Sequence, residues 1–209
     1  MIKAIVFDMD GVLIEAKDWH YEALNKALAL FGYEISRFDH ITTYDGLPTR
    51  RKLEMLTIER GLPRELHGFI NEMKQLYTME IVHTQCKPRF IHEHALSSLK
   101  AKGYKIGLAS NSIRSTIETM MEKAYLASYI DAKFSNEDVA LPKPDPEIYI
   151  KAMAALDVEP AETLIVEDNE NGVRAAISSG AHVLFVRGVN DVTLGNITSK
   201  ISQLEKSSK

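Results

Sequence analysis

The sequence predicts an α/β protein with a parallel sheet and one long helical insertion. Short apolar runs rich in β-branched residues recur along the chain, and patterns typical of amphipathic helices separate them. This alternation favours parallel strand pairing through right-handed crossovers. One stretch in the first half of the chain has helical periodicity and no convincing strand. We therefore expect an open parallel sheet interrupted by a small helical domain.

Five runs are expected to form the strands. Residues 2–7 are apolar and end abruptly at Asp8, which is typical of a buried strand. Similar runs lie at residues 104–109, 163–166 and 183–186, and a weaker one at 131–134.

Helices are expected between these runs, at residues 89–102, 115–123, 146–156 and 171–179. Ser115 precedes Glu118 by three positions, which indicates a capping box. Asp145-Pro146 resembles an N-cap followed by proline at the first helical position, and Gly180 fits a helix C-terminus.

The helical insertion is expected to be a separate domain. Helices are predicted near residues 48–60 and 63–79, which places the insertion at 15–84 and the sheet domain at 1–14 and 85–209. The insertion follows the carboxyl end of the first strand. Ligands bind at that edge in open α/β sheets, so the insertion could act as a lid.

Composition excludes several classes of protein. The 209 residues include 25 Lys+Arg and 29 Asp+Glu, and a formal net charge of −4 argues against nucleic acid as the partner. No run approaches the roughly 18 apolar residues of a membrane span. The single cysteine, Cys86, cannot form an internal disulfide, which suits a reducing compartment. We expect a cytoplasmic protein with no membrane partner; its oligomeric state is open, with a monomer favoured.

Chemically useful side chains follow four of the expected strands. They are Asp8 and Asp10, then Ser110-Asn111-Ser112, then Lys143 in Leu141-Pro142-Lys143-Pro144, and finally Glu167-Asp168. A parallel sheet brings the carboxyl ends of its strands to one edge. We therefore expect four carboxylates, a hydroxyl and one ammonium in one crevice.

This set suits phosphoryl chemistry supported by a metal ion. Crowded carboxylates repel, and hard oxygen ligands favour Mg²⁺ as the compensating cation. Asp8 and Asp168 would supply oxygens, and Asp10 its backbone carbonyl. Lys143 and Ser110 could hold a phosphoryl group, one aspartate could attack phosphorus, and a second acid two residues away could protonate the leaving oxygen.

Each piece alone has a structural explanation. Asp-x-Asp-Gly is commonly a turn, Ser110-Asn111-Ser112 could start a helix, Lys143 could be a solvated loop residue, and Glu167-Asp168 could begin a helix. Their joint occurrence at four strand ends favours the functional interpretation.

The chain resembles the haloacid dehalogenase-like superfamily. The resemblance rests on Phe7-Asp8-Met9-Asp10-Gly11-Val12-Leu13, Ala109-Ser110-Asn111, Lys143-Pro144-Asp145-Pro146 and Glu167-Asp168-Asn169-Glu170-Asn171-Gly172, in this order. It implies a Rossmann-like core with a helical cap, and it extends to the subgroup of β-phosphoglucomutase and sugar-phosphate phosphatases.

The resemblance also implies roles for individual residues. Asp8 would be the nucleophile and Asp10 the general acid and base. Ser110, Asn111 and Lys143 would bind the phosphoryl group. Asp8, Asp10 and Asp168 would hold Mg²⁺, and Glu167 would orient the metal's ligands through water. In the cap, His20 matches a hinge histidine of the mutase; Arg50 is a further candidate, one position farther from Gly46 than the mutase's phosphate-binding arginine.

The leading functional prediction is a Mg²⁺-dependent phosphatase of a small phosphorylated metabolite, with a sugar phosphate as the expected substrate. The alternatives are a sugar-phosphate mutase, a phospho-aspartate receiver that signals, and an inactive phosphate-binding relative. Glu15-Ala16, Asn169 and the cap loop depart from the mutase pattern. Arg51 and Lys74 could also contact a substrate, although a solvated surface explains each of them as well.

Overall fold

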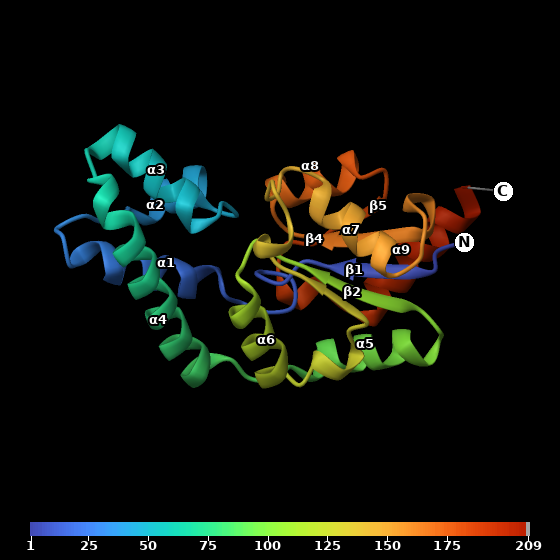
Figure 1. Ribbon diagram of the computed structural model, residues 1–209. Coiled ribbons are helices and arrows are strands. Elements are labelled where there is room, and N and C mark those ends of the chain that lie inside the picture. Colours follow the sequence, from blue (N-terminus) through green and yellow to red (C-terminus); the bar gives the residue numbers. More distant parts are fainter. Residues whose placement is uncertain (208–209) are drawn as a thin grey trace. The chain divides into compact units, whose positions relative to one another are not determined.

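The computed structural model describes residues 1–207, which divide into two compact units (Figure 1). The core unit comprises Met1–Glu15 and the chain from Lys87 onward, and the helical unit comprises Ala16–Cys86.

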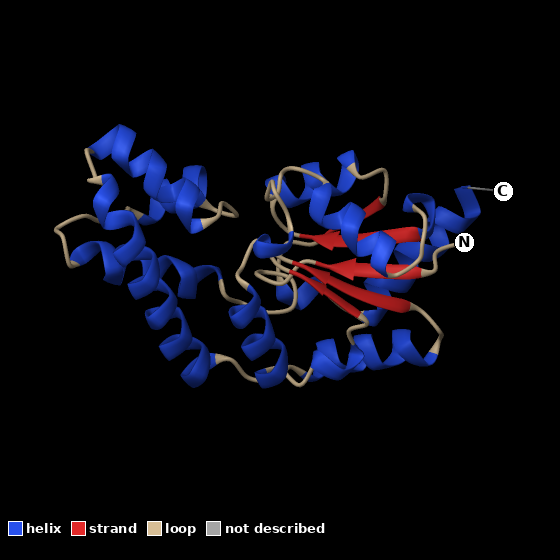
Figure 2. Ribbon diagram, viewed as in Figure 1, coloured by secondary structure: helices blue, strands red, loops and turns tan. Residues whose placement is uncertain are grey.

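The core unit contains a parallel sheet whose strand order is β3-β2-β1-β4-β5 (Figure 2). In this register Phe7 lies beside Leu108 on one neighbouring strand and Val166 on the other. The sheet confirms the predicted α/β class and all five predicted strands, although the first begins at Ala4 rather than at residue 2. The strands are β1 (Ala4–Phe7), β2 (Lys105–Ala109), β3 (Ala132–Phe134), β4 (Thr163–Glu167) and β5 (His182–Phe185).

Helices cover this sheet. Side chains of β1 and β4, including Val6 and Ile165, pack with Ile148 of α7 and Ala175 of α8, while α5 packs against β2 and α9. The apolar content of the strands therefore reflects burial against helices. These helices are α5 (Phe90–Ala101), α6 (Arg114–Lys123), α7 (Glu147–Ala155), α8 (Glu170–Ser178) and α9 (Leu194–Ser207), with short 3-10 turns η3 (Ala127–Tyr129), η4 (Asn136–Asp138), η5 (Pro160–Glu162) and η6 (Val189–Asp191).

The signal at Gly180 is confirmed: Gly180 adopts φ +82° just beyond Ser179, the C-cap of α8. At the start of α7 the prediction is off by one residue, because the helix begins at Glu147 and Pro146 is its N-cap. The Asp145 carboxylate still accepts a hydrogen bond from Glu147 N at 2.9 Å.

The prediction of a capping box at Ser115 was wrong: α6 begins at Arg114, and its N-cap residue, Ile113, offers no side-chain hydrogen bond. The Glu137 carboxylate, from η4, accepts the Arg114 N–H at 2.7 Å instead.

In the part of the chain that the structure describes, the helical unit contains no strand, as predicted. Leu28 of α1 packs with Leu53 and Leu56 of α3 and Ile70 of α4. The last helix is longer than expected and ends at Gln85. The elements are α1 (Lys17–Ala29), α2 (Arg37–Asp39), a π-helical turn η1 (His40–Tyr44), α3 (Thr49–Arg60), η2 (Arg64–Leu66) and α4 (His67–Gln85). Among residues 1–207, no helix is both long and apolar enough to cross a membrane.

The carboxyl ends of the parallel strands lie at one edge of the sheet (Figure 2). Asp8 directly follows β1, Ser110 follows β2, and Asp168 follows β4. The fold therefore gathers the side chains that the sequence analysis selected.

Candidate active site

The turn after β1 positions the first two aspartates. Asp8 extends the strand pairing by one hydrogen bond, from its N–H to the carbonyl of Val166 at 3.0 Å. The chain then turns at Gly11, whose φ of +88° lies in the left-handed region that side chains disfavour. The N–H groups of Leu13 and Ile14 both donate to the Met9 carbonyl at 2.9 Å. A fixed turn thus holds Asp8, which is buried, and Asp10 at the edge of the sheet.

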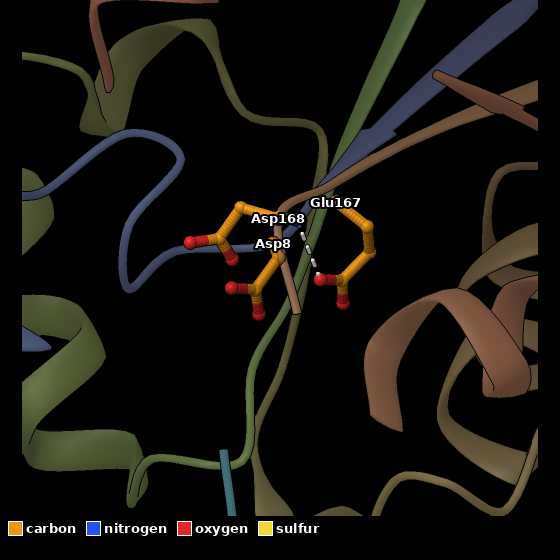
Figure 3. Close-up of side chains that lie close together, drawn as sticks. All are labelled: Asp8, Glu167 and Asp168. Carbon is orange, nitrogen blue, oxygen red and sulfur yellow. Dashed lines mark hydrogen bonds between the residues drawn. The ribbon is translucent and has the colours of Figure 1, made fainter. Parts of the chain in front are cut away.

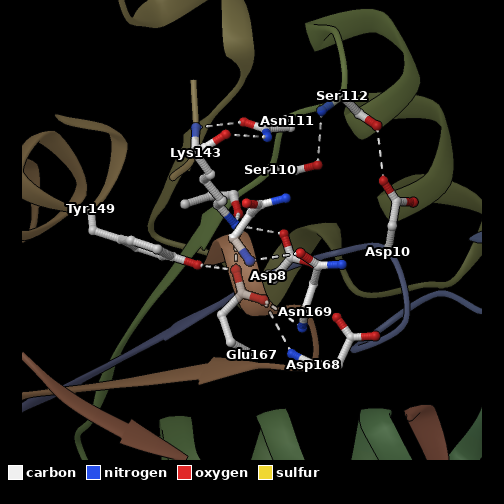
Figure 4. A network of polar contacts seen from close by, with 12 residues as sticks. Asp8, Asp10, Ser110, Asn111, Ser112, Lys143, Tyr149, Glu167, Asp168 and Asn169 are labelled. Carbon is white, nitrogen blue, oxygen red and sulfur yellow. Dashed lines mark hydrogen bonds and ion pairs between the residues drawn. The ribbon is translucent and has the colours of Figure 1, made fainter. Parts of the chain in front are cut away.

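Lys143 lies at the centre of the polar network (Figure 4). Its ammonium donates to Oδ1 of Asp8 at 2.7 Å, to Oε1 of Glu167 at 2.7 Å and to the Ala109 carbonyl at 2.9 Å. Only 3% of the residue is exposed. Its three donors therefore have three acceptors, one from each of three strand ends.

Asn111 holds the backbone of the lysine loop. Its Oδ1 accepts from Lys143 N at 3.1 Å, and its Nδ2 donates to the Lys143 carbonyl at 3.3 Å. The neighbouring Ser110 is buried, and its Oγ accepts from Ser112 N at 3.0 Å. The motif after β2 thus supports Lys143 as well as offering a hydroxyl at the edge.

Three buried carboxylates, those of Asp8, Glu167 and Asp168, lie close together (Figure 3). One oxygen each from Asp8, Glu167 and Asp168 lies within 4.8 Å of the other two. Together with the Lys143 ammonium, these three carboxylates carry a formal charge of −2. The cluster is therefore a candidate site for a divalent cation.

Burial and neighbouring charge both act on the ionisable groups. Burial raises the pKa of the Asp8 carboxyl well above its usual range; Lys143 opposes this, and the adjacent Glu167 and Asp168 carboxylates add to it. For Lys143, burial acts to lower the pKa, but attraction to Asp8 and Glu167 outweighs it and the pKa is raised. Lys143 therefore stays charged at neutral pH.

Two further polar contacts involve residues to which the sequence analysis gave no role. Ser112 Oγ donates to Oδ2 of Asp10 at 2.9 Å, and the Tyr149 hydroxyl donates to Oε1 of Glu167 at 2.5 Å. Ser112 lies inside the quoted motif after the second strand but resembles a helix start, and Tyr149 lies three residues beyond Pro146 and resembles an apolar helix position. The available signal was the apolar periodicity of α7, which places Tyr149 on the buried face of the helix together with Ile148 and Ala152.

The structure brings together Asp8, Asp10, Ser110, Asn111, Lys143, Glu167 and Asp168 in the core unit (Figure 4). The other two candidates belong to the helical unit. His20 Nδ1 lies 3.2 Å from the ammonium of Lys74 on α4. Arg50 is exposed and pairs with Glu54 one turn along α3.

Comparisons with known proteins identify similar chains. A phosphorylated carbohydrates phosphatase of Thermotoga maritima is 28% identical over 195 residues, covering 91% of this chain and 88% of that protein. The β-phosphoglucomutase of Bacillus subtilis is 29% identical over 196 residues, covering 90% and 83% respectively. The crystal structure of a β-phosphoglucomutase from Clostridium difficile superposes with a TM-score of 0.83 at 23% identity, covering 97% of this chain and 98% of that one. The family model for haloacid dehalogenase-like hydrolases matches residues 5–186, and the chain belongs to this family.

Proposed function

We propose that this protein is a phosphatase of small phosphorylated metabolites, with sugar phosphates as the expected substrates. One observation carries the proposal: the Asp8 carboxylate lies 2.7 Å from the Lys143 ammonium, inside a buried acidic cluster. This pairing puts a nucleophilic oxygen beside a cation that can neutralise phosphoryl oxygens. Relatives named as phosphatases of phosphorylated carbohydrates and of phosphoglycolate support the substrate class.

In the first step, an oxygen of Asp8 attacks phosphorus and forms an aspartyl-phosphate while the bond from phosphorus to the ester oxygen breaks. Asp10 donates a proton to that leaving oxygen. In the second step, Asp10 takes a proton from water as the water oxygen attacks phosphorus. Inorganic phosphate leaves, and the Asp8 carboxylate and the Asp10 acid are restored. Lys143 and Ser110 hold the phosphoryl oxygens throughout.

The donor set fits Mg²⁺. Carboxylate oxygens are the hard ligands that this ion prefers, and a divalent cation would balance the formal charge of −2. We propose that Asp8, Asp168 and the backbone carbonyl of Asp10 would hold the ion. Glu167 would orient these ligands rather than bind the ion itself, because its two oxygens already accept hydrogen bonds from Lys143, Tyr149 and two backbone N–H groups. When bound, the ion would offset the negative charge that develops on the phosphoryl group.

We propose that residues 15–84 form a helical cap domain and that residues 1–14 and 85–209 form the catalytic core domain. Because the helical unit is inserted directly after the Asp8–Asp10 turn, closure of the cap would exclude water from the site. His20 and Arg50 are the cap residues proposed to contact the substrate.

The decisive experiment is a screen of phosphorylated metabolites with Mg²⁺, measuring release of inorganic phosphate. Rapid release from a sugar phosphate supports the phosphatase. Isomerisation that depends on a sugar bisphosphate would instead indicate a mutase, which the likeness to β-phosphoglucomutases supports as second candidate. A phosphoprotein that persists for minutes, without turnover, would indicate a receiver.

We further propose that the enzyme is a cytoplasmic monomer that binds neither nucleic acid nor membranes. The lone cysteine supports a reducing compartment, and the net charge of −4 supports the absence of a nucleic-acid partner. Size-exclusion chromatography tests the monomer against its mass of 23.5 kDa.

A further inference from the structure

The Lys143 ammonium is held from two sides. Asp8, the proposed nucleophile, accepts from it on one side, and Glu167 accepts on the other. Asp8 must change its bonding when it attacks phosphorus. Glu167 therefore remains as the charged partner that can keep the ammonium in place during the reaction.

Glu167 is itself fixed by several donors. Its Oε1 accepts from the Tyr149 hydroxyl at 2.5 Å, and its Oε2 accepts from the backbone N–H groups of Asp168 at 3.1 Å and Asn169 at 3.4 Å (Figure 4). Tyr149 is fully buried and Glu167 is 1% exposed. The tyrosine ring also lies against the lysine, with Nζ 4.7 Å from the ring centroid. Tyr149 and Lys143 thus both donate side-chain hydrogen bonds to Oε1 of Glu167.

A second element makes room for this carboxylate. Gly172 lies in the first turn of α8, and a Cβ atom there would come within 1.9 Å of Oε1 and 2.3 Å of Oε2 of Glu167. No side chain could occupy that position without moving the carboxylate. Tyr149 on α7 thus holds the Glu167 carboxylate by a hydrogen bond, and Gly172 on α8 leaves the space that the carboxylate occupies.

We propose that Tyr149 is a positioning residue for phosphoryl transfer, which acts through Glu167 to hold the Lys143 ammonium beside Asp8. The inference rests on the proposed function and adds a residue to it. The hydroxyl could instead serve packing alone, because a buried polar group needs a partner. The two explanations differ in what removal of the hydroxyl does to kcat.

Tyr149→Phe removes the hydroxyl and keeps the ring. We expect kcat to fall about tenfold with KM within about twofold, because the lysine stabilises charge that develops in the transition state. The loss should be equal for alkyl and aryl phosphates, since Lys143 faces the phosphoryl group that both share. Gly172→Ala is the second variant, and it should produce the same kinetic pattern by displacing Glu167.

Tyr44→Phe is the matched control. Tyr44 is also buried, and its hydroxyl also donates to a glutamate, Glu59, at 2.7 Å, but it lies in the helical unit and in none of the proposed machinery. We expect both Tyr44→Phe and Tyr149→Phe to lower the melting temperature, and Tyr44→Phe to leave kcat unchanged.

A double-mutant cycle tests whether Tyr149 acts through Glu167. In a Glu167→Gln background, Tyr149→Phe should cause no further loss of kcat. Wild-type kcat in both Tyr149→Phe and Gly172→Ala would overturn the proposal. An undiminished effect of Tyr149→Phe in the Glu167→Gln background would also overturn it.

Calorimetric titration with orthovanadate and Mg²⁺ separates this proposal from the proposed function, because vanadate can adopt the five-coordinate geometry of the phosphoryl-transfer transition state. If the wild type hydrolyses no phosphate ester, the proposed function fails, whereas the positioning role still predicts weaker vanadate binding in Tyr149→Phe than in Tyr44→Phe. Equal vanadate affinity in the two variants would then overturn the positioning role.

Discussion

The ammonium of Lys143 lies 2.7 Å from Oδ1 of Asp8, although the two residues are 135 positions apart in the chain. The contact depends on the parallel sheet, which ends β1 and the strands beside it at one edge. It also depends on Asn111, which holds the Lys143 backbone on both its N–H and its carbonyl. A pair placed in this way suits the proposed reaction, in which Asp8 attacks phosphorus and Lys143 stabilises the negative charge of the phosphoryl group.

Asp8→Asn is expected to abolish turnover and preserve the fold. The amide has nearly the same shape as the carboxylate but is a poor nucleophile, so kcat should fall by at least about 10³-fold while circular dichroism is unchanged. Asp157→Asn is the control: that residue is exposed and has φ +51°, a conformation that asparagine tolerates. Wild-type turnover in purified Asp8→Asn would remove Asp8 from the nucleophilic role.

Removal of divalent cations is expected to inactivate the enzyme, and added Mg²⁺ should restore it. The buried carboxylates of Asp8, Glu167 and Asp168 lie too close to be stable without a balancing cation. Mg²⁺ should also raise the melting temperature of the wild type, because a ligand stabilises the state that binds it.

Asp168→Asn should raise the Mg²⁺ concentration needed for half-maximal activity by at least about tenfold. Glu170→Gln, two residues away with an 85% exposed side chain, should leave that concentration unchanged. Full activity after dialysis against EDTA into metal-free buffer would contradict the metal assignment.

Sequence patterns were sufficient for the sheet and for the clustering of the site. Asp8, Ser110 and Asp168 each stand directly after a run that forms a strand, and strand ends in a parallel sheet must meet. These patterns could not predict which side chains from different elements form hydrogen bonds with one another. Tyr149 has the periodicity of any buried helix position, and nothing local shows that its hydroxyl reaches Glu167.

The wrong capping box has the same cause. Ser115 and Glu118 satisfy the local rule, yet Glu137, 23 positions beyond Arg114, supplies the acceptor at the start of α6. A tertiary contact therefore replaced the local one and moved the start of the helix by one residue.

The free energy of unfolding of the helical unit is expected to decrease as the pH is lowered, because of His40. This residue is buried and packs against Tyr21 with the two rings tilted by 42° and their centroids 4.9 Å apart. Burial, with the nearby Lys52 charge, lowers the pKa of His40 from 6.5 to about 4. Between these values the unfolded chain binds a proton that the folded chain does not. The free energy of unfolding should therefore fall by up to about 1.4 kcal/mol for each unit that pH drops through this range.

Urea unfolding at about pH 7 and about pH 5 measures this effect. His40→Phe keeps a ring against Tyr21 and cannot take up the proton, so its stability should depend less on pH than that of the wild type. His94→Phe controls for the loss of a histidine, since His94 is exposed and stacks on Phe90. An identical pH dependence in wild type and His40→Phe would contradict the prediction.

Asp10→Asn is expected to separate proton transfer from binding. The asparagine oxygen can still accept the hydrogen bond that Ser112 donates to Oδ2 of Asp10 at 2.9 Å, so the side chain should keep its place. If Asp10 protonates the leaving oxygen, kcat for alkyl phosphates should fall by at least about 10²-fold. An aryl phosphate such as p-nitrophenyl phosphate leaves as a stabilised phenolate, so formation of its aspartyl-phosphate should be much less affected.

Hydrolysis of the aspartyl-phosphate should slow for both substrates, because Asp10 also activates the water. Rapid mixing of Asp10→Asn with p-nitrophenyl phosphate should therefore give a burst of p-nitrophenolate followed by slow turnover. Tyr149→Phe offers the contrast, since its loss should be equal for both leaving groups and should give no burst. If Asp10→Asn slowed phosphorylation of the enzyme equally for alkyl and aryl substrates, Asp10 would be a structural or metal-binding residue rather than the acid, because the proton matters only in proportion to the basicity of the leaving oxygen.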